Sequence, residues 1–167
     1  MATTDDRRTA SHTTQFSTPN DTDVVAVSVF DAPRRLVWEA HVKPEHVTKW
    51  LLGPDGWSMP VCEIDLRPGG RWHYVWRHDA DGSEFGMEGT YREIVPYERL
   101  VSTERWGPAW PEAVNTYLFR EENGRTTLTV TAHYPSREAR DKAIGTGMES
   151  GWARSNDRLD GYLSTIA

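Results

Sequence analysis

The alternation of apolar and polar positions divides the chain into a helical C-terminal segment and a series of strands. Over residues 136–166 apolar side chains recur at three- and four-residue spacing, which predicts a long amphipathic helix. The apolar stripe consists of Ile144, Met148, Trp152, Leu159, Tyr162, Leu163 and Ile166. We expect the strands upstream to close on this helix.

Glycines interrupt the first half of this helical segment. They are Gly145, Gly147 and Gly151. Because a glycine inside a helix costs about 1 kcal/mol relative to alanine, three of them need an explanation. One interpretation is a break near Gly145, with a second helix that starts at Thr146 as N-cap. The other is that small residues leave room for a cavity between helix and sheet, with Met148 and Trp152 as its wall. Both can hold together.

The N-terminal half opens with one strand and two short helices. Residues 24–30 are rich in β-branched side chains and predict a strand. An acidic residue and a proline within residues 31–33 predict the start of a helix. A second short helix follows Pro44 and ends at the Gly- and Pro-containing turn of residues 53–56.

From residue 57 the apolar period changes to two, which is typical of half-buried strands. The predicted strands span residues 58–66, 71–78, 84–95, 99–106, 114–121 and 126–134. Short turns join them, and Asn123-Gly124 is the strongest hairpin signal. The predicted order is one strand, two short helices, six antiparallel strands in a meander and a long helix. The fold class is therefore α+β, with about seven strands.

Length and composition indicate one domain and a polar tail. Residues 23–167 suffice for a single core, whereas residues 1–22 are dominated by Thr, Ser, Asp and Arg. Phe16 is the only large apolar side chain of that tail, so we expect the tail to be mobile. Residues 14–18 are the part that could lie against a sheet edge.

Charge and composition exclude several classes of protein. The net charge of −6 and the absence of a basic cluster argue against nucleic-acid binding. No apolar run is long enough for membrane insertion and no secretory leader opens the sequence, so a cytoplasmic location is expected. Cys62 is the single cysteine and sits among apolar neighbours, which predicts a buried and inert thiol.

Short motifs spread along the chain resemble one known family. They are Phe30-Asp-Ala-Pro33, Val37-Trp38-Glu39-Ala40, Pro44-Glu45-His46 with Lys49-Trp50, Asp65-Leu-Arg-Pro-Gly-Gly70, Gly89-Thr-Tyr-Arg-Glu-Ile-Val-Pro96, Arg99-Leu100, Gly124-Arg-Thr126, and Gly147-Met-Glu-Ser-Gly-Trp152 followed by Leu159. Across about residues 15–166 the chain resembles the homologues of the activator of heat-shock-protein ATPase, within the START-related, birch-pollen-allergen-like superfamily (SRPBCC).

The resemblance implies a helix-grip fold, a curved antiparallel sheet wrapped around a long C-terminal helix with a cavity between them. It implies less about chemistry. The superfamily contains lipid and steroid carriers, aromatic-polyketide cyclases, hormone receptors and co-chaperones, so the fold alone does not decide the function.

Large rings are the candidate lining of such a cavity. Trp72, Tyr74 and Trp76 share one face of their strand, and Phe85, Met87 and Tyr91 share one face of the next. The predicted ligand-binding residues are Trp50, Trp57, Trp72, Tyr74, Trp76, Met87, Tyr91, Trp106, Trp110, Tyr117, Met148 and Trp152. The competing interpretation is that these rings only fill a core. Which strand faces point inward is left open.

Titratable residues show no catalytic pattern. Those nearest the presumed cavity are His73, His78, Glu88, Glu104, His133 and Glu149, and no spacing among them singles out an acid–base pair, so we expect surface or structural roles. His41 and His46 lack a companion metal-ligand motif, and neither a metal nor another cofactor is expected. The loop of residues 107–112 displays Trp110, either as a lid over the cavity or as a pinned surface loop.

Three functions remain after these steps. The leading hypothesis is a soluble protein that binds a small hydrophobic or aromatic molecule between sheet and helix. The enzyme alternative, a cyclase, isomerase or hydrolase, needs a buried acid or His with a shifted pKa facing that cavity. A co-chaperone is the third, and we expect no chaperone partner because only a tail precedes the domain. A homodimer through an exposed sheet face is left open.

Overall fold

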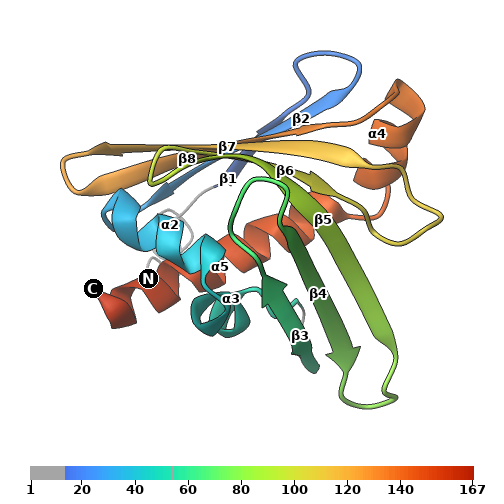
Figure 1. The fold of residues 1–167 in the computed structure, drawn as a ribbon, viewed down its shortest axis with the longest axis horizontal. Coiled ribbons are helices and arrows are strands. Elements are labelled where there is room, and N and C mark those ends of the chain that lie inside the picture. Colours follow the sequence, from blue (N-terminus) through green and yellow to red (C-terminus); the bar gives the residue numbers. More distant parts are fainter. Residues whose placement is uncertain (1–13, 54) are drawn as a thin grey trace, which may run out of the picture.

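One curved antiparallel sheet wraps around the C-terminal helix (Figure 1). The computed structural model describes residues 14–53 and 55–167, and within them the sheet has eight strands in the order β1-β2-β8-β7-β6-β5-β4-β3. The strands are β1 (Thr14–Ser17), β2 (Asp23–Phe30), β3 (Trp57–Ile64), β4 (Arg71–His78), β5 (Glu84–Val95), β6 (Arg99–Glu104), β7 (Ala113–Glu122) and β8 (Arg125–His133). Strands β3 to β8 form the predicted meander, and β8 returns to β2.

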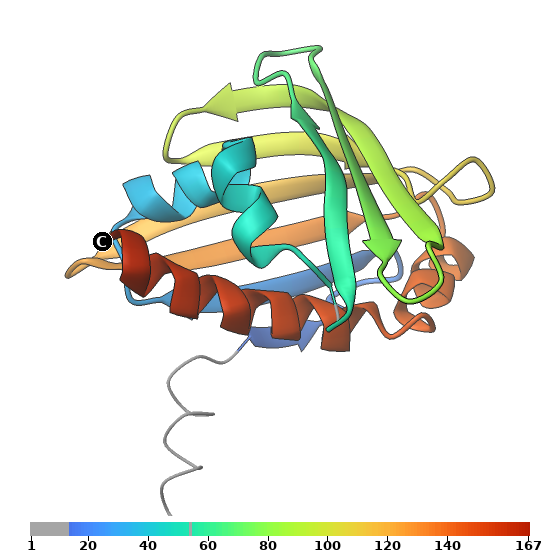
Figure 2. The ribbon, with the colours of Figure 1, turned by 90° about the horizontal axis from the view of Figure 1, so that it is seen from below.

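Helices cover the concave side of this sheet. They are α2 (Arg34–Val42), α3 (Pro44–Trp50), α4 (Arg137–Ile144) and α5 (Met148–Ile166). Figure 2 shows α5 running along the open side of the curved sheet, with α2 and α3 toward one of its ends and α4 at the other. None of the described helices is long and apolar enough to cross a membrane. The α+β helix-grip prediction is confirmed.

Most predicted elements are confirmed, and the main addition is β1. The spans of β4 and β5 agree with the prediction to the residue. Strand β1 pairs with the outer edge of β2, so the sheet has eight strands where the pattern predicted about seven. The mobility was predicted for residues 1–22. Of these, residues 14–17 form β1 and pair with β2, as the sheet-edge interpretation of residues 14–18 expected. Residues 1–13 lie outside the described residues, and the division at residue 23 stays a prediction.

Strand β6 is shorter than predicted because the chain leaves the sheet after Glu104. Arg105 forms only an isolated bridge with Glu88, and Gly107 has a φ of 112°, a left-handed conformation that a side chain would strain. The strand pattern of residues 99–106 therefore included two residues of a loop, and Trp106 belongs to that loop.

The predicted break in the C-terminal helix is present. Helix α4 ends at Ile144 and α5 begins at Met148, with Gly147 between them at φ 83°. The N-cap prediction was wrong, because Gly147 takes the cap position of α5. The Thr146 hydroxyl instead donates a hydrogen bond of 2.6 Å back to the Ala143 carbonyl and helps to end α4.

Helix α5 is held mainly by the elements that lie beside it. Its principal neighbours are α2, α3, α4 and β1. The Asn156 amide donates hydrogen bonds to the Ser28 and Thr14 hydroxyls, at 2.9 and 3.1 Å. Nδ1 of His46 and the Tyr162 hydroxyl share a hydrogen bond of 2.6 Å, which ties α3 to α5. The helix thus spans the concave face without packing flat on the central strands.

Gly89 allows β4, β5 and β6 to approach each other closely. A Cβ at Gly89 would lie 1.8 Å from the Thr103 carbonyl oxygen and 2.6 Å from Nε1 of Trp72. That indole donates a hydrogen bond of 3.1 Å to the same carbonyl. Any side chain at residue 89 would therefore displace backbone as well as the Trp72 ring.

We predict that Gly89→Ala lowers the free energy of unfolding by roughly 3 kcal/mol, through overpacking and loss of the Trp72 hydrogen bond. Gly86→Ala on the same strand is the matched control, because its Cβ would meet no atom closer than the Tyr74 carbonyl at 3.4 Å. Urea denaturation of both variants measures the difference. Equal losses in the two variants would contradict this account.

Candidate functional site

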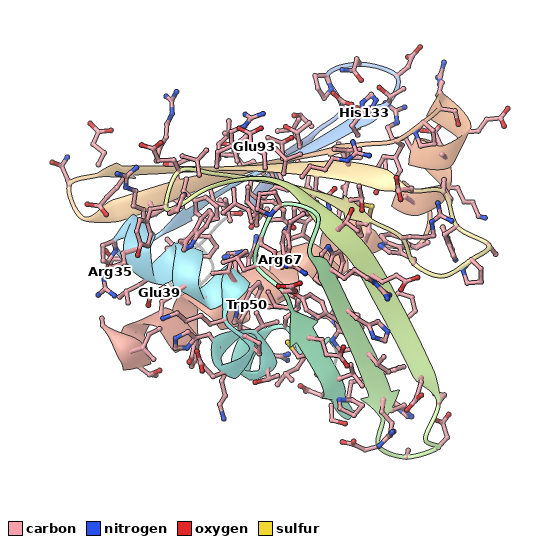
Figure 3. All side chains as sticks on the ribbon, in the orientation of Figure 1. Arg35, Glu39, Trp50, Arg67, Glu93 and His133 are labelled. Atoms are coloured by element: carbon pink, nitrogen blue, oxygen red, sulfur yellow. The ribbon has the colours of Figure 1, made fainter. Side chains whose placement is uncertain are left out.

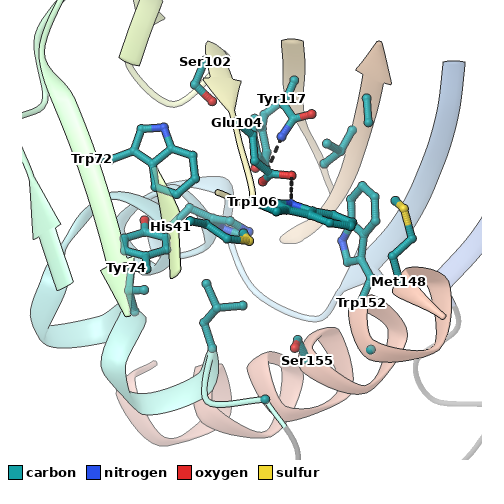
Figure 4. Close-up of a pocket in the computed structure, with 18 of the residues that line it drawn as sticks. His41, Trp72, Tyr74, Ser102, Glu104, Trp106, Tyr117, Met148, Trp152 and Ser155 are labelled. Atoms are coloured by element: carbon teal, nitrogen blue, oxygen red, sulfur yellow. Dashed lines mark hydrogen bonds between the residues drawn. The ribbon is translucent and has the colours of Figure 1, made fainter. Parts of the chain in front are cut away.

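A cavity of about 590 Å³ lies between the concave face of the sheet and α5 (Figure 4). Alternate residues of each central strand form its walls, as the pleat of a sheet requires. From β4 these are Trp72, Tyr74 and Trp76, and from β6 they are Leu100, Ser102 and Glu104. The lining is mostly apolar and aromatic, with a few polar tips.

All of the residues predicted to bind a ligand line this cavity. They are Trp50, Trp57, Trp72, Tyr74, Trp76, Met87, Tyr91, Trp106, Trp110, Tyr117, Met148 and Trp152. Phe85, the further ring assigned to the same face of β5, lines it as well. The open question of which strand faces point inward is thereby answered. Ligand binding by these side chains stays a prediction.

Several indoles are fixed by hydrogen bonds to backbone carbonyls. Nε1 of Trp50 donates to Ala40 at 2.9 Å, and Nε1 of Trp76 donates to Leu51 at 2.8 Å. Together with Trp72, these rings have no N–H left for a ligand. They therefore present rigid carbon surfaces to the cavity, which suits an apolar or aromatic molecule.

One face of α5 forms the opposite wall. Met148, Gly151, Trp152, Ser155 and Asn156 line the cavity at positions that share a helix face. Apart from its chain neighbours and the backbone of its own helix, no atom of the described residues lies within 4 Å of the position a Gly151 Cβ would take. Both interpretations of the glycines therefore hold: Gly145 and Gly147 lie at the helix break, and Gly151 leaves space in the cavity.

Glu104 places a carboxyl group in this apolar lining. Oε2 accepts a hydrogen bond of 2.9 Å from Nε1 of Trp106, and Oε1 accepts one of 3.2 Å from Nδ2 of Asn115 (Figure 4). Burial raises the pKa of Glu104, while these two hydrogen bonds act in the opposite direction. The sequence pattern predicted a surface or structural role for Glu104, and the prediction of a surface position was wrong.

His41 is the second titratable group of the lining. Its Nδ1–H donates a hydrogen bond of 2.7 Å to the Val37 carbonyl, one turn earlier in α2. Its ring meets Trp50 and Tyr117 edge to face. Burial lowers the pKa of His41 to about 4, so the imidazole is neutral at pH 7 and Nε2 has a free lone pair.

Sequence reasoning missed His41 as a cavity residue. It weighed His41 only as a metal ligand, although its spacing from Val37 and Ala40 puts it on the apolar face of the helix. This position could have identified His41, because a polar ring on the apolar face of a helix needs either a hydrogen-bond partner in the core or contact with a cavity.

The remaining titratable candidates lie away from the cavity lining. Figure 3 shows His133 and Glu93 on the convex side of the sheet, opposite α5. Nδ1 of His133 is 2.6 Å from Asp23, and Nδ1 of His78 is 3.0 Å from Asp81. Glu88 pairs with Arg71 at 2.7 Å. His73, on the outer face of β4, and Glu149, in the first turn of α5, are likewise outside the lining.

The loop of residues 107–112 forms the end wall of the cavity. The ring centroids of Trp106 and Trp110 are 5.2 Å apart, and both rings line the cavity. Nζ of Lys142 lies 4.3 Å from the centre of the Trp110 ring. The Trp106 contact is made within the loop, and the Lys142 contact ties Trp110 to α4. The lid and the pinned surface loop both stay predictions.

Neither a metal cluster nor a reactive thiol is found among the described residues. No three His, Cys, Asp or Glu side chains among them are placed to hold a metal ion. Cys62 is half-buried, and burial raises the pKa of its thiol to about 11. The thiol is therefore protonated at pH 7 and a poor nucleophile.

The curved sheet, the α5 helix across its concave side and the cavity between them together define a helix-grip protein of the START-related class. Comparison with protein families gives the particular family. Residues 31–164 match the family described as "Activator of Hsp90 ATPase homolog 1-like protein", and the chain belongs to it. A search of curated protein sequences found no match.

Solved structures share the fold at low sequence identity. A protein from Rhodobacter sphaeroides is 24% identical with a TM-score of 0.85, over 93% of this chain and 100% of that one. A protein from Nitrosomonas europaea is 26% identical with a TM-score of 0.78, over 89% of this chain and 98% of that one. An AHSA1-like protein from Aeromonas hydrophila is 19% identical with a TM-score of 0.72, over 86% and 93%.

We predict that His41 makes the protein less stable in acid. The folded-state pKa of about 4 lies below the ordinary 6.5, so between these values the unfolded chain binds a proton that the folded chain does not. The free energy of unfolding therefore falls as the pH falls from 6.5 to 4, by up to roughly 3 kcal/mol.

Chemical denaturation of His41→Phe between pH 7 and pH 4 tests this prediction. The slope of stability against pH should be shallower in His41→Phe than in the natural protein. His73→Phe, on the outer face of β4, is the matched control and should keep the natural slope. An unchanged slope in His41→Phe would show that its protonation does not limit acid stability.

Proposed function

We propose that the protein binds one small hydrophobic or aromatic molecule in the cavity between its sheet and α5. The cavity carries this proposal, because its volume of about 590 Å³ falls in the range of small-molecule sites. Three rings of its wall, Trp50, Trp72 and Trp76, are fixed by hydrogen bonds from their N–H groups to backbone carbonyls. Such a preformed wall reduces the ordering cost of binding.

The anchoring of α5 also supports a permanent cavity. Besides the Asn156 and His46 hydrogen bonds, Nη1 of Arg158 donates to the Gly53 carbonyl at 2.9 Å. Phe16 and Trp152 pack edge to face with their centroids 5.7 Å apart. Because these contacts fix both flanks of the helix, collapse of α5 onto the central strands would break several of them at once.

An enzyme acting in the same cavity is the second candidate. The observation that favours it is Glu104, an inward-facing carboxyl group whose pKa is raised in an apolar environment, in a cavity that also contains the neutral His41. A cyclase, isomerase or hydrolase could use such a group as acid or base. Incubation of a bound compound with the protein, followed by mass spectrometry, distinguishes conversion from simple binding.

A co-chaperone role rests only on the description of the family. Stimulation of a chaperone ATPase by the purified protein would support that role. An unchanged ATPase rate would argue against that role and leave ligand binding or catalysis in the cavity as the remaining functions.

Solvent extraction of freshly purified protein followed by mass spectrometry is the direct test of the binding proposal. We predict a stoichiometric hydrophobic compound in the extract, or stoichiometric uptake of the neutral dye Nile red by protein that releases none. A protein that releases no compound and takes up no dye would refute the proposal.

Filling the cavity from α5 should block binding. We predict that Gly151→Phe weakens Nile red binding at least roughly tenfold, because the ring would occupy the open space next to Gly151. Gly161→Phe in the same helix is the matched control, since Gly161 also has no atom within 4 Å of its Cβ position but does not line the cavity. Met148→Trp provides a second filling variant. Unchanged affinity in folded Gly151→Phe and Met148→Trp would refute this site.

A further inference from the structure

We propose that the cavity selects ligands with a protonated amine, which the Glu104 carboxylate binds at the aromatic end of the cavity. This inference rests on the proposed binding function and names the chemical class of the ligand. Three properties of the described residues support it: the charge of the lining, the free hydrogen-bonding capacity of the carboxylate, and the rings beside it.

The described lining contains one acidic group and no cationic side chain to pair with it. Glu104 is the only Asp, Glu, Lys or Arg among the described residues that line the cavity. Nearby cations are engaged elsewhere: Arg105 lies 3.9 Å from Glu112, and Lys142 lies over the Trp110 ring. His41, which is neutral at pH 7, adds no positive charge. A buried carboxylate without a cation is costly, and a cationic ligand offsets that cost.

The hydrogen bonds of Glu104 position its carboxylate without neutralising it. The indole of Trp106 and the amide of Asn115 each donate to one oxygen, and both donors are uncharged. Each carboxylate oxygen can accept a further hydrogen bond. An ammonium group donates up to three, and charge-assisted hydrogen bonds of this kind are about twice as strong as neutral ones.

Aromatic rings surround the same end of the cavity. Trp106 lies within hydrogen-bonding distance of the carboxylate, and Trp110 packs against Trp106. Tyr117 also lines this region, and the charge of Glu104 contributes to raising its pKa. A cation held at Glu104 therefore lies beside ring faces that attract it. Anionic ligands are repelled by the Glu104 carboxylate, and no Lys or Arg among the described lining residues offsets that repulsion.

Three naphthalene compounds that differ only in their polar group test this selectivity. They are 2-naphthylmethylamine, 2-naphthalenemethanol and 2-naphthoic acid, which at pH 7 are cationic, neutral and anionic. We expect isothermal titration calorimetry to show that the amine binds at least roughly tenfold more tightly than the alcohol, because it adds a charge-assisted hydrogen bond. The acid should bind most weakly.

Glu104→Gln removes the charge and should keep the packing. The new side-chain oxygen can accept from Trp106, and the new amide can donate to Oδ1 of Asn115 once that amide rotates. Oδ1 of Asn115 is buried and has no partner among the described residues. We expect the variant to lose the preference for the amine while binding of the alcohol changes less than about threefold, the usual effect of a neutral replacement.

Glu149→Gln is the matched control. It also removes one carboxylate, but Glu149 lies in the first turn of α5 and its side chain does not line the cavity. It should keep the preference for the amine. Equal binding of amine and alcohol by the natural protein, or an unchanged preference in Glu104→Gln, would overturn the inference while binding of the alcohol still supports the proposed function. Nile red binding without any naphthalene binding would also overturn it. No binding of any of the four probes, by protein that releases no compound on extraction, would refute the proposed function itself.

Discussion

The attachment of α5 at its flanks is the constraint on which the rest of the structure depends. Asn156 bonds to the hydroxyls of Ser28 and Thr14, and Tyr162 bonds to His46 on α3. These contacts fix the helix against the edge of the sheet and against α3. Because the helix is held there, the curved central strands remain uncovered beneath it, and their inward side chains line a cavity instead of a packed layer.

The same cavity explains why polar groups are tolerated in an aromatic interior. Trp50, Trp72 and Trp76 satisfy their N–H groups with backbone carbonyls, so their burial leaves no donor without a partner. Glu104 and His41 are different, since each keeps free acceptor capacity toward the cavity. Groups that reduce the stability of the free protein in this way are typical of sites that recognise a ligand.

Periodicity predicted the fold and most of the cavity wall. The two-residue period of β4 and β5 placed Trp72, Tyr74 and Met87 on shared faces, and the resemblance to a helix-grip family implied a cavity between sheet and helix. Which of those faces line the cavity was decided only by the structure. Glu104 could not be predicted, because its environment comes from two separate events: the chain leaves β6 immediately after it, and the register of β7 brings Asn115 beside it. The cap of α5 depended likewise on the left-handed backbone of Gly147, which a sequence pattern does not specify.

Fold and chemical selectivity are separable in this molecule. The bonds that hold α5 to its flanks and the close approach at Gly89 involve residues other than Glu104, and structures only 19–26% identical share the fold. The sign of the charge in the cavity, in contrast, depends on one side chain held by Trp106 and Asn115. Under the proposed function, a change at that position would alter which ligands fit electrostatically and leave the bonds of the sheet and of α5 in place. Family membership therefore gives the architecture, and the composition of the lining sets the chemistry of the cavity.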